Sequence, residues 1–331
     1  MNTAYTAHTA DTVRNGAVVS IVLPVQGTDA ALDRVVQSVR AQTEQDWQLY
    51  LVEPAGARGR ASRWAAHDGR IQVLRQEGCG GRAAALRLGL QHCLGTYTVF
   101  LDAEHVWAPY FLALTRAFLD AFTLEDLVCM ASVTPAGQPA AVYRRADVRG
   151  HGRLDAVLDP SALRGLPDAV AGALWQQGEL ARHLRWGEYT RLAVTLLRTE
   201  EAERLLPALY EDTEALEYRL QARLAARSAV NVLALPGAVF HAAGVSPEVA
   251  RQREIDALAV FDEVHGRQWE TDPEVARLRR ERLARIDQRA PLGALGALGA
   301  VVARCLGWSR QDRPARALPA DLGGPQVGHP H

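Results

Sequence analysis

The chain has 331 residues, enough for one large domain or two smaller ones and enough to bury a core without disulfides or metals. Its formal net charge of −1 argues against a strong global attraction to nucleic acid or to an anionic membrane. All 37 basic residues are arginine, and the four cysteines lack the C-x-x-C spacing of a zinc or redox site. We therefore expect reduced thiols, a cytoplasmic protein and no nucleic-acid partner.

The first 105 residues alternate between apolar runs and helical patterns. Four apolar runs predict buried strands: 18–25, 49–52, 71–74 and 97–101. Apolar residues at helical spacing predict helices over about 29–43 and 81–93. Strands that alternate with helices of this length indicate βαβ units. We therefore predict an α/β fold, with a mostly parallel central sheet flanked by helices.

Beyond residue 105 the pattern is less regular. We expect helices at 110–122 and 169–186 and around Leu216–Leu224, and strands at 127–133, 192–197, 230–235 and 238–240. Residues 145–170 are rich in Arg, Asp, Gly and Pro and are expected to form a loop. The charged helical pattern over 247–289 predicts a C-terminal helical appendage.

The two ends of the chain differ from the rest. Residues 1–16 are polar, without the apolar core of a signal peptide, and are expected to be flexible. The apolar run 290–303 is too short to span a bilayer. It either packs on the protein or, with the residues up to 308, makes a peripheral membrane contact. The proline-containing tail 309–331 is expected to be disordered.

The most informative segment is 99–104, an apolar strand that ends in Asp102 and Glu104. Ligands of open α/β sheets bind at the carboxyl ends of the strands, so both carboxylates fall where a ligand is expected. Such a pair suits Mg²⁺ or Mn²⁺ carrying a diphosphate. On this segment alone, a strand that simply ends in a solvated acidic turn is an equally good interpretation.

Six motifs, in order along residues 18–246, resemble the family 2 glycosyltransferases. They are the run 19–25, the S-x-x-x-Q-T segment 38–43, Gly80-Gly81 before an alanine-rich helix, the F-L-D-x-E segment 100–104 with Trp107 and Pro109, Glu211-Asp212, and the segment 241–246. The resemblance implies the GT-A fold of nucleotide-diphospho-sugar transferases over residues 17–246. It implies a nucleotide-binding half, 17–105, and an acceptor half, 106–246, followed by the helical extension 247–308 and the tail 309–331.

The resemblance also implies an activity and a set of site residues. The activity is transfer of a sugar from a nucleotide-sugar donor, most simply a UDP-sugar, to a glycan, lipid-linked or small-molecule acceptor. The residues implied to contact the nucleotide are Pro24, Gln26, Glu53 and Asp102. Arg82, just after Gly80-Gly81 and near a predicted helix start, is a further candidate that could reach a phosphate, and a solvated helix arginine is the alternative interpretation. The residues implied to hold Mn²⁺ or Mg²⁺ are Asp102, Glu104 and His241. Trp186 and His183 are candidates for the acceptor pocket.

The pair Glu211-Asp212 carries the catalytic assignment. Asp212 is the predicted general base, and Glu211 is expected to orient it or to bind acceptor hydroxyls. Direct attack assisted by a single base implies inversion at the anomeric carbon. Ordinary capping of a helix N-terminus is the structural alternative for Asp212.

The sequence also departs from the family pattern. The second strand ends in Glu53-Pro54 where the family has V-D-D-G-S, the A-R-N segment becomes 85–87 (Ala-Leu-Arg), and His105 stands where a further Asp is common. These departures leave a second hypothesis open, a catalytically silent homologue that binds a nucleotide, glycan or protein partner. A dinucleotide oxidoreductase is disfavoured, because the first strand is not followed by G-x-G-x-x-G.

Overall fold

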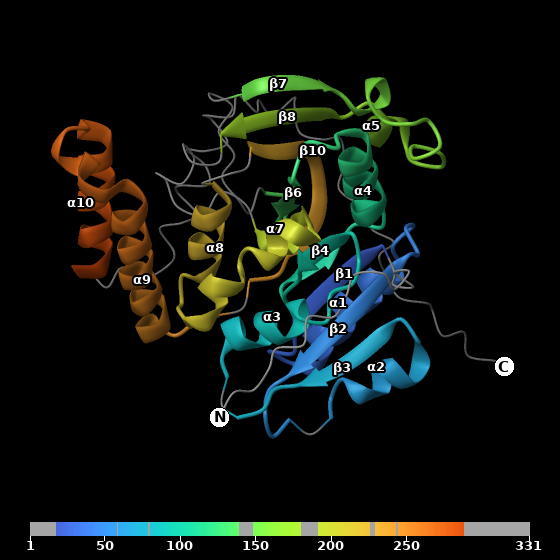
Figure 1. Cartoon of the computed structure of the whole chain (residues 1–331), viewed down its shortest axis with the longest axis horizontal. Helices are drawn as coiled ribbons and strands as arrows, with labels where there is room; N and C mark the ends of the chain where they lie inside the picture. Colours follow the sequence, from blue (N-terminus) through green and yellow to red (C-terminus); the bar gives the residue numbers. More distant parts are fainter. Residues whose placement is uncertain are drawn as a thin grey trace, which may run out of the picture.

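The computed structural model describes residues 18–57, 59–78, 80–138, 148–179, 191–225, 229–242 and 244–287. Within these ranges the chain forms one ten-stranded sheet with helices on both faces (Figure 1). The strand order is β3-β2-β1-β4-β9-β6-β10-β8-β7, and β5 pairs with β10 outside this path. The expected α/β architecture is confirmed.

The N-terminal half of the sheet is entirely parallel. Its strands are β1 (Val19–Pro24), β2 (Trp47–Glu53), β3 (Ile71–Arg75) and β4 (Tyr97–Phe100). The crossover helices are α1 (Asp29–Arg40), α2 (Ser62–His67) and α3 (Arg82–Leu90). All six residues of β1 are buried, because helices cover both of its faces. All four carboxyl ends therefore meet at one edge of the sheet.

The C-terminal half is mixed. Its strands are β5 (His105–Trp107), β6 (Leu127–Val133), β7 (Val148–Arg153), β8 (Leu174–Glu179), β9 (Thr195–Arg198) and β10 (Ala229–Phe240). β9 lies antiparallel between β4 and β6. β10 runs parallel to β6 and antiparallel to both β8 and β5. The expectation of mainly parallel pairing therefore describes the N-terminal half of the sheet.

The helices and short 3-10 turns of this half complete the fold. They are α4 (Phe111–Ala121), η2 (Leu154–Ala156), α5 (Asp168–Ala171), η4 (Leu192–Val194), α7 (Thr199–Glu203), η5 (Leu206–Tyr210), α8 (Leu216–Ala225), α9 (Pro247–His265), η6 (Gly266–Glu270) and α10 (Pro273–Asp287).

Two apolar cores lie on opposite faces of the sheet. Ile21 and Leu23 of β1 pack with α1 and α4, whereas Val22 packs with α3, α8 and α9 on the other face. α3 approaches the sheet closely at Gly89, where a Cβ atom would overlap the side chain of Val22. This close approach fixes α3, and therefore its N-terminus, against the centre of the sheet.

Two expectations for the middle of the chain are wrong. In the described part of the helix expected over 169–186, the helical stretch is α5 (Asp168–Ala171), and Leu174–Glu179 form strand β8 instead. The expected loop 145–170 contains β7, which pairs with β8 at the top of Figure 1. β7 reads V-R-G-H-G-R, and it is held by main-chain pairing at the end of the sheet, so it carries no alternation of apolar residues.

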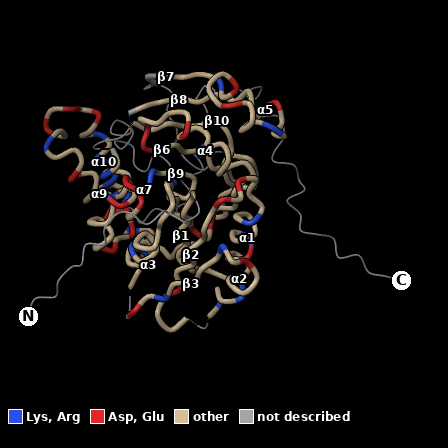
Figure 2. Tube along the Cα trace, turned by 45° about the vertical axis from the view of Figure 1, so that its right-hand side comes forward, with Lys and Arg blue, Asp and Glu red and all other residues tan. Residues whose placement is uncertain are grey.

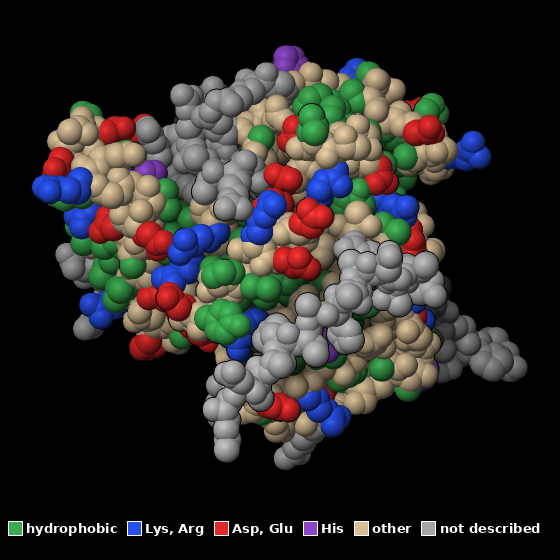
Figure 3. All heavy atoms as spheres, in the orientation of Figure 1, with side chains coloured by type: hydrophobic (Ala, Val, Ile, Leu, Met, Phe, Trp, Pro, Cys, Tyr) green, Lys and Arg blue, Asp and Glu red, His purple; other side chains and the backbone are tan. Residues whose placement is uncertain are grey.

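Of the C-terminal helices, α9 packs against α8 and α10 packs against α9, far from β3 (Figure 1). The chain turns between them at Gly266, whose φ of 50° lies in the left-handed region. Charged residues are dense along both helices in Figure 2, and acidic and basic side chains are interspersed on the face seen in Figure 3. Among the described helices, none combines the length and apolarity needed to cross a bilayer. The segment 290–308, with its predicted membrane contact, lies outside the described residues.

Candidate functional site

The candidate site lies at the carboxyl edge of β1, β2 and β4. Pro24 is the last residue of β1, Glu53 is the last residue of β2, and Asp102 follows β4 by two residues. Gln26 is exposed just beyond β1, and Arg82 is the first residue of α3. All five predicted nucleotide contacts therefore lie on elements that converge on this edge.

Asp102 anchors a tight turn. Its Oδ1 accepts hydrogen bonds from the backbone N–H groups of Glu104 (2.9 Å) and His105 (3.1 Å), and lies 2.7 Å from Nδ1 of His105. Burial raises the pKa of Asp102, but the opposing effects of His105, Arg82 and the Glu104 amide are larger. The pKa of this carboxyl is therefore well below its usual range. The side chain is 17% exposed, so a bound ligand can reach an ionised carboxylate.

His105, which stands where the family commonly has a further Asp, contributes directly to this site. Its side chain is fully buried, and its ring lies 4.9 Å from that of Phe240, its partner in the β5–β10 pairing. An ionised carboxylate only accepts hydrogen bonds, so Nδ1 of His105 is the donor to Asp102. Nε2 is buried without a hydrogen-bond partner among the residues that the structure describes.

The same edge holds two residues that the sequence analysis missed. Glu217 of α8 is 4% exposed and binds Nη2 of Arg82 through Oε1 (3.0 Å) and Nη1 of Arg191 through Oε2 (3.1 Å). Burial raises the pKa of Glu217, but Arg191 and Arg82 lower it further than burial raises it. Arg191 in turn lies over the ring of Phe240, 5.4 Å from its centroid.

Five contacts, together with the electrostatic interaction between Arg82 and Asp102, form a loop that we call the contact ring. It consists of Asp102, His105, Phe240, Arg191, Glu217 and Arg82. One signal in the sequence could have indicated Glu217. It shares a buried helical face with Leu220 and Leu224, where an unpaired glutamate would be costly. Arg191 carries no comparable signal, because it follows a segment without a clear pattern.

The predicted metal ligands lie close together along the backbone. The carbonyl of Glu104 accepts the N–H of His241 (2.7 Å), which brings both residues beside the Asp102 turn. Burial, Arg34 and His105 lower the pKa of His241, which favours the neutral imidazole that a metal requires. Within the described residues, no group of three or more His, Cys, Asp or Glu side chains could hold a metal alone. Mg²⁺ and Mn²⁺ can be held by one or two carboxylates with a diphosphate and waters, so the residues present suit a cation that arrives with its diphosphate.

Asp212 lies at the N-terminus of α3, not at that of α8. Its exposed carboxylate accepts the N–H of Ala83 (3.4 Å) and packs against Gly81, where a Cβ atom would overlap it. Asp212 therefore does bind the N-terminus of a helix, as the alternative interpretation of this residue had it, but that helix is α3, which is distant from Asp212 in the sequence. Glu211 is 70% exposed and pairs with Arg219.

The loop that carries Asp212 is held by the C-terminal helices. Asp256 of α9 accepts the hydroxyl of Thr213 (2.6 Å) and the N–H of Glu214 (2.8 Å). Because α8 begins two residues later, α9 fixes both the loop and the start of the helix that carries Glu217.

Glu53 occupies the position implied to recognise the base. It is fully buried, its Oε1 accepts the N–H of Ala61 (2.7 Å), and its Oε2 lies 3.5 Å from Nε of Arg75. Glu53 therefore also closes the 54–61 loop that follows β2.

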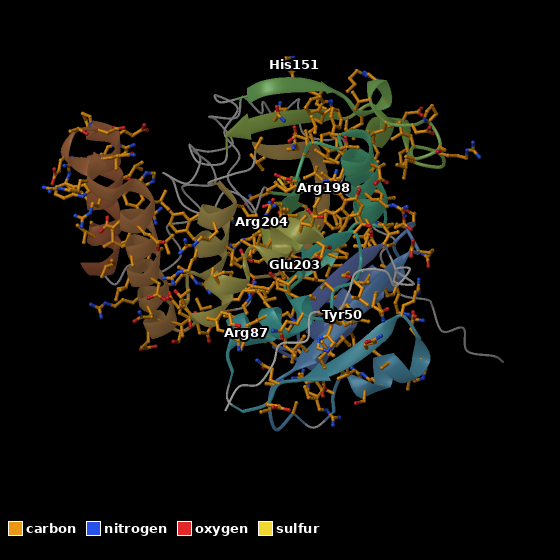
Figure 4. The ribbon with its side chains drawn as sticks, viewed as in Figure 1. Tyr50, Arg87, His151, Arg198, Glu203 and Arg204 are labelled. Carbon is orange, nitrogen blue, oxygen red and sulfur yellow. The ribbon has the colours of Figure 1, made fainter. Side chains whose placement is uncertain are left out.

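The A-R-N departure has a simple structural outcome. Leu86 is buried in the core, and Arg87 covers the ring of Tyr210 at 4.3 Å on the outer side of α3 (Figure 4). Arg82, one turn earlier, is the arginine of α3 that joins the contact ring. The predicted acceptor residues His183 and Trp186 lie outside the described residues.

Comparison with known proteins agrees with this geometry. Residues 20–149 match the sequence model of glycosyl transferase family 2. EpsE of Bacillus subtilis is 26% identical over 160 residues, which cover 47% of this chain and 55% of EpsE. The glycosyltransferase GlyG of Streptococcus pneumoniae is 27% identical over 92 residues, which cover 27% of this chain and 31% of GlyG. The matched region thus spans about half, or less, of these curated relatives.

The fold is also that of solved glycosyltransferase structures. TarS of S. aureus (residues 1–349) has a TM-score of 0.52 at 12% identity, covering 84% of this chain and 76% of that one. Its complex with UDP has a TM-score of 0.51 at 13% identity, covering 85% and 77%. At this level of identity the likeness establishes the GT-A fold and nothing further.

Proposed function

We propose that this chain, whose residues 20–149 match the sequence model of glycosyl transferase family 2, transfers a sugar from a nucleoside-diphosphate donor to an acceptor hydroxyl. The observation that carries the proposal is the Asp102 turn at the end of β4. There a carboxylate is kept ionised by His105 and Arg82, at the sheet edge where α/β folds bind nucleotides.

The leaving group of this reaction is a nucleoside diphosphate, whose growing negative charge must be stabilised in the transition state. Arg82 lies at the first position of α3, where the helix dipole also favours an anion. The proposal therefore assigns the diphosphate to the space bounded by Asp102 and the N-terminus of α3.

A divalent cation fits this assignment. Mn²⁺ or Mg²⁺ would be held by Asp102, with Glu104 and His241 as further candidate ligands, and would act as a Lewis acid on the diphosphate. The protein's own part is to orient the carboxylate, which His105 does from its buried position.

Asp212 is our candidate for the general base that removes the proton of the acceptor hydroxyl. Its carboxylate is exposed and is held by the N–H of Ala83, so it can accept a proton without leaving its position. A single base with direct attack predicts inversion at the anomeric carbon. Glu211 is assigned a secondary role, because Arg219 already pairs with its carboxylate.

The donor base is proposed to be uracil. The solved relative TarS has been crystallised with UDP. In this chain Glu53 ends β2 at the position implied to contact the base, and its Oε2, which lies 3.5 Å from Nε of Arg75, has no hydrogen-bond partner among the described residues.

The experiment is a calorimetric titration of the purified chain with UDP, GDP, CDP and dTDP, each with Mn²⁺ and with EDTA. We expect one nucleotide, UDP, to bind, and to bind more tightly with Mn²⁺. If none of the four binds under either condition, the donor site is refuted and the silent homologue becomes the better description.

A further inference from the structure

We propose that Arg82 and Arg191 form a two-arginine clamp for the donor diphosphate, and that Glu217 is the positioning residue that sets their spacing. This inference rests on the proposed function, since it assumes that a phosphorylated donor binds at this edge. It adds two residues, Arg191 and Glu217, that neither the motifs nor the family match indicates.

The spacing comes from one carboxylate shared by two guanidinium groups. Oε1 of Glu217 binds Arg82 at 3.0 Å and Oε2 binds Arg191 at 3.1 Å, so the two arginines are fixed on either side of a buried group. A guanidinium carries five N–H donors in a planar fork, so it can bind a carboxylate oxygen and other acceptors at the same time. Arginine forks fixed in this way match the geometry of phosphate oxygens.

The exposed fractions of the three side chains show which end of the clamp is accessible to a ligand. The side chain of Glu217 is 5% exposed, whereas those of Arg82 and Arg191 are 31% and 28% exposed. The carboxylate is therefore the closed end of the arrangement and the guanidinium groups are its accessible end. The ring of Phe240 packs against the guanidinium group of Arg191, with 5.4 Å between the ring centroid and Cζ, and also contacts the ring of His105. Phe240 therefore connects the clamp to the Asp102 turn.

The pairing of Glu217 is the reverse of that of Arg116 in α4. Arg116, with a side chain that is 30% exposed, pairs with two acids, Glu44 and Asp120, whereas Glu217 is one acid that pairs with two arginines. One acid paired with two arginines also occurs at Asp68, which binds Arg40 and Arg70, so it is the place of Glu217 beside the Asp102 turn, and not the pairing alone, that assigns it to the donor site. Two arginines and a divalent cation would together balance most of the charge of Asp102, Glu217 and a diphosphate.

The test measures anion binding directly, with inorganic pyrophosphate and UDP as the probes, each in EDTA and in Mn²⁺. The variants are R82Q, R191Q, E217Q and E217D, with R116Q as a control of equal exposure. Thermal melting establishes that each variant is folded. We expect R82Q and R191Q each to weaken binding of both probes about tenfold or more, the usual scale of a lost charge-assisted hydrogen bond, and R116Q to leave binding unchanged.

Glu217 can be tested by the sign of its effect. If Glu217 only neutralised the arginines, E217Q would leave more positive charge and pyrophosphate would bind more tightly. A positioning role predicts weaker binding in E217Q and partial recovery in E217D. Tighter binding in E217Q would overturn the positioning role, and unchanged pyrophosphate and UDP affinity in R82Q and R191Q would overturn the clamp.

The outcomes also separate this inference from the proposed function. If the wild-type chain binds UDP while the arginine variants bind it equally well, the donor site stands and the clamp fails. If pyrophosphate binds through both arginines but no nucleotide binds, the clamp stands and the assigned donor fails. If the wild-type chain binds neither probe, both are refuted.

Discussion

Asp102 and Asp212 are the two carboxylates on which the assigned chemistry depends, and their surroundings differ sharply. Asp102 belongs to the contact ring, and its carboxylate accepts hydrogen bonds from a buried histidine and two backbone amides. Asp212 is exposed and its carboxylate accepts one long bond, from Ala83. The difference fits their tasks, since a group that stabilises a leaving diphosphate benefits from a fixed position, whereas a base must meet a variable acceptor.

The largest effect is expected on turnover when Asp212 is changed to Asn. The amide oxygen can still accept the N–H of Ala83, so the loop keeps its position while the base is lost. We expect kcat to fall by about 10²–10⁴, the usual contribution of general-base catalysis, with donor affinity unchanged. Glu211→Gln is the matched control, and a larger loss in that variant would reverse the roles of the two acids.

A smaller effect is expected on donor affinity when Asp102 is changed to Ala. The carboxylate proposed to hold the cation is lost, so the affinity for UDP in Mn²⁺ should fall to the value measured in EDTA. Asp102→Asn, which retains the shape of the side chain, should behave in the same way. Calorimetry is the readout, and equal affinities of wild type and variants in Mn²⁺ would exclude Asp102 as a ligand.

Gly81 links the two regions, because it precedes Arg82 and contacts Asp212. In Gly81→Ala the new Cβ atom would displace the carboxylate of Asp212, so we expect kcat to fall about tenfold or more with little change in donor affinity. Gly69→Ala, where a Cβ atom meets open space, is the control. If donor affinity falls more than kcat in Gly81→Ala, then Gly81 serves the diphosphate site instead.

The smallest effect is expected at Asp68, before β3 and so at the opposite edge of the sheet. Hydrogen bonds from Arg70 and Arg40 lower its pKa to about 2. Because the folded-state pKa lies below the unfolded value, its stabilisation is present above about pH 4 and is lost as the pH falls through 2. Asp68→Asn should lower Tm by roughly 2–4 °C at pH 7, equivalent to about 1 kcal/mol, and by less at pH 2.5. The affinity for the donor should not change in Asp68→Asn. A weaker donor affinity in this variant would mean that a lowered pKa does not by itself distinguish a structural carboxylate from a functional one.

Much of the N-terminal half could be predicted from the sequence, because its strands are buried on both faces and read as continuous apolar runs. The predicted strand 71–74 matches β3 to within one residue, and the run 18–25 contains all of β1. β7 and β8 could not be predicted in this way. Their pairing is carried by the backbone, and their side chains, such as His151 on the outer strand in Figure 4, follow no apolar period.

The residues of the candidate site likewise fall into two groups, those that local sequence patterns predict and those that they do not. Asp102 and Glu53 could be predicted because each ends an apolar strand, and the sheet then brings them to one edge. Glu217 and Arg191 lie more than 85 residues further along the chain than Asp102, and only the folded chain, through the ion pairs of Glu217 with Arg82 and Arg191, brings them together at this edge. Local patterns do not report a pairing between distant elements, which is also why the helix whose N–H group binds the predicted base Asp212 is α3 and not the neighbouring α8.

Strand β10 sets a constraint on chain length. Near its start it pairs with β8, at its end Phe240 pairs with His105, and its register with β6 shifts twice between Leu233 and Ala238. Side chains alternate faces along a strand, so removing one residue from this irregular stretch would turn Phe240 away from His105 and Arg191. The number of residues between the two paired stretches is therefore as much a part of the site as the side chains themselves, and a homologue that differs by one residue there would need a different support for its histidine.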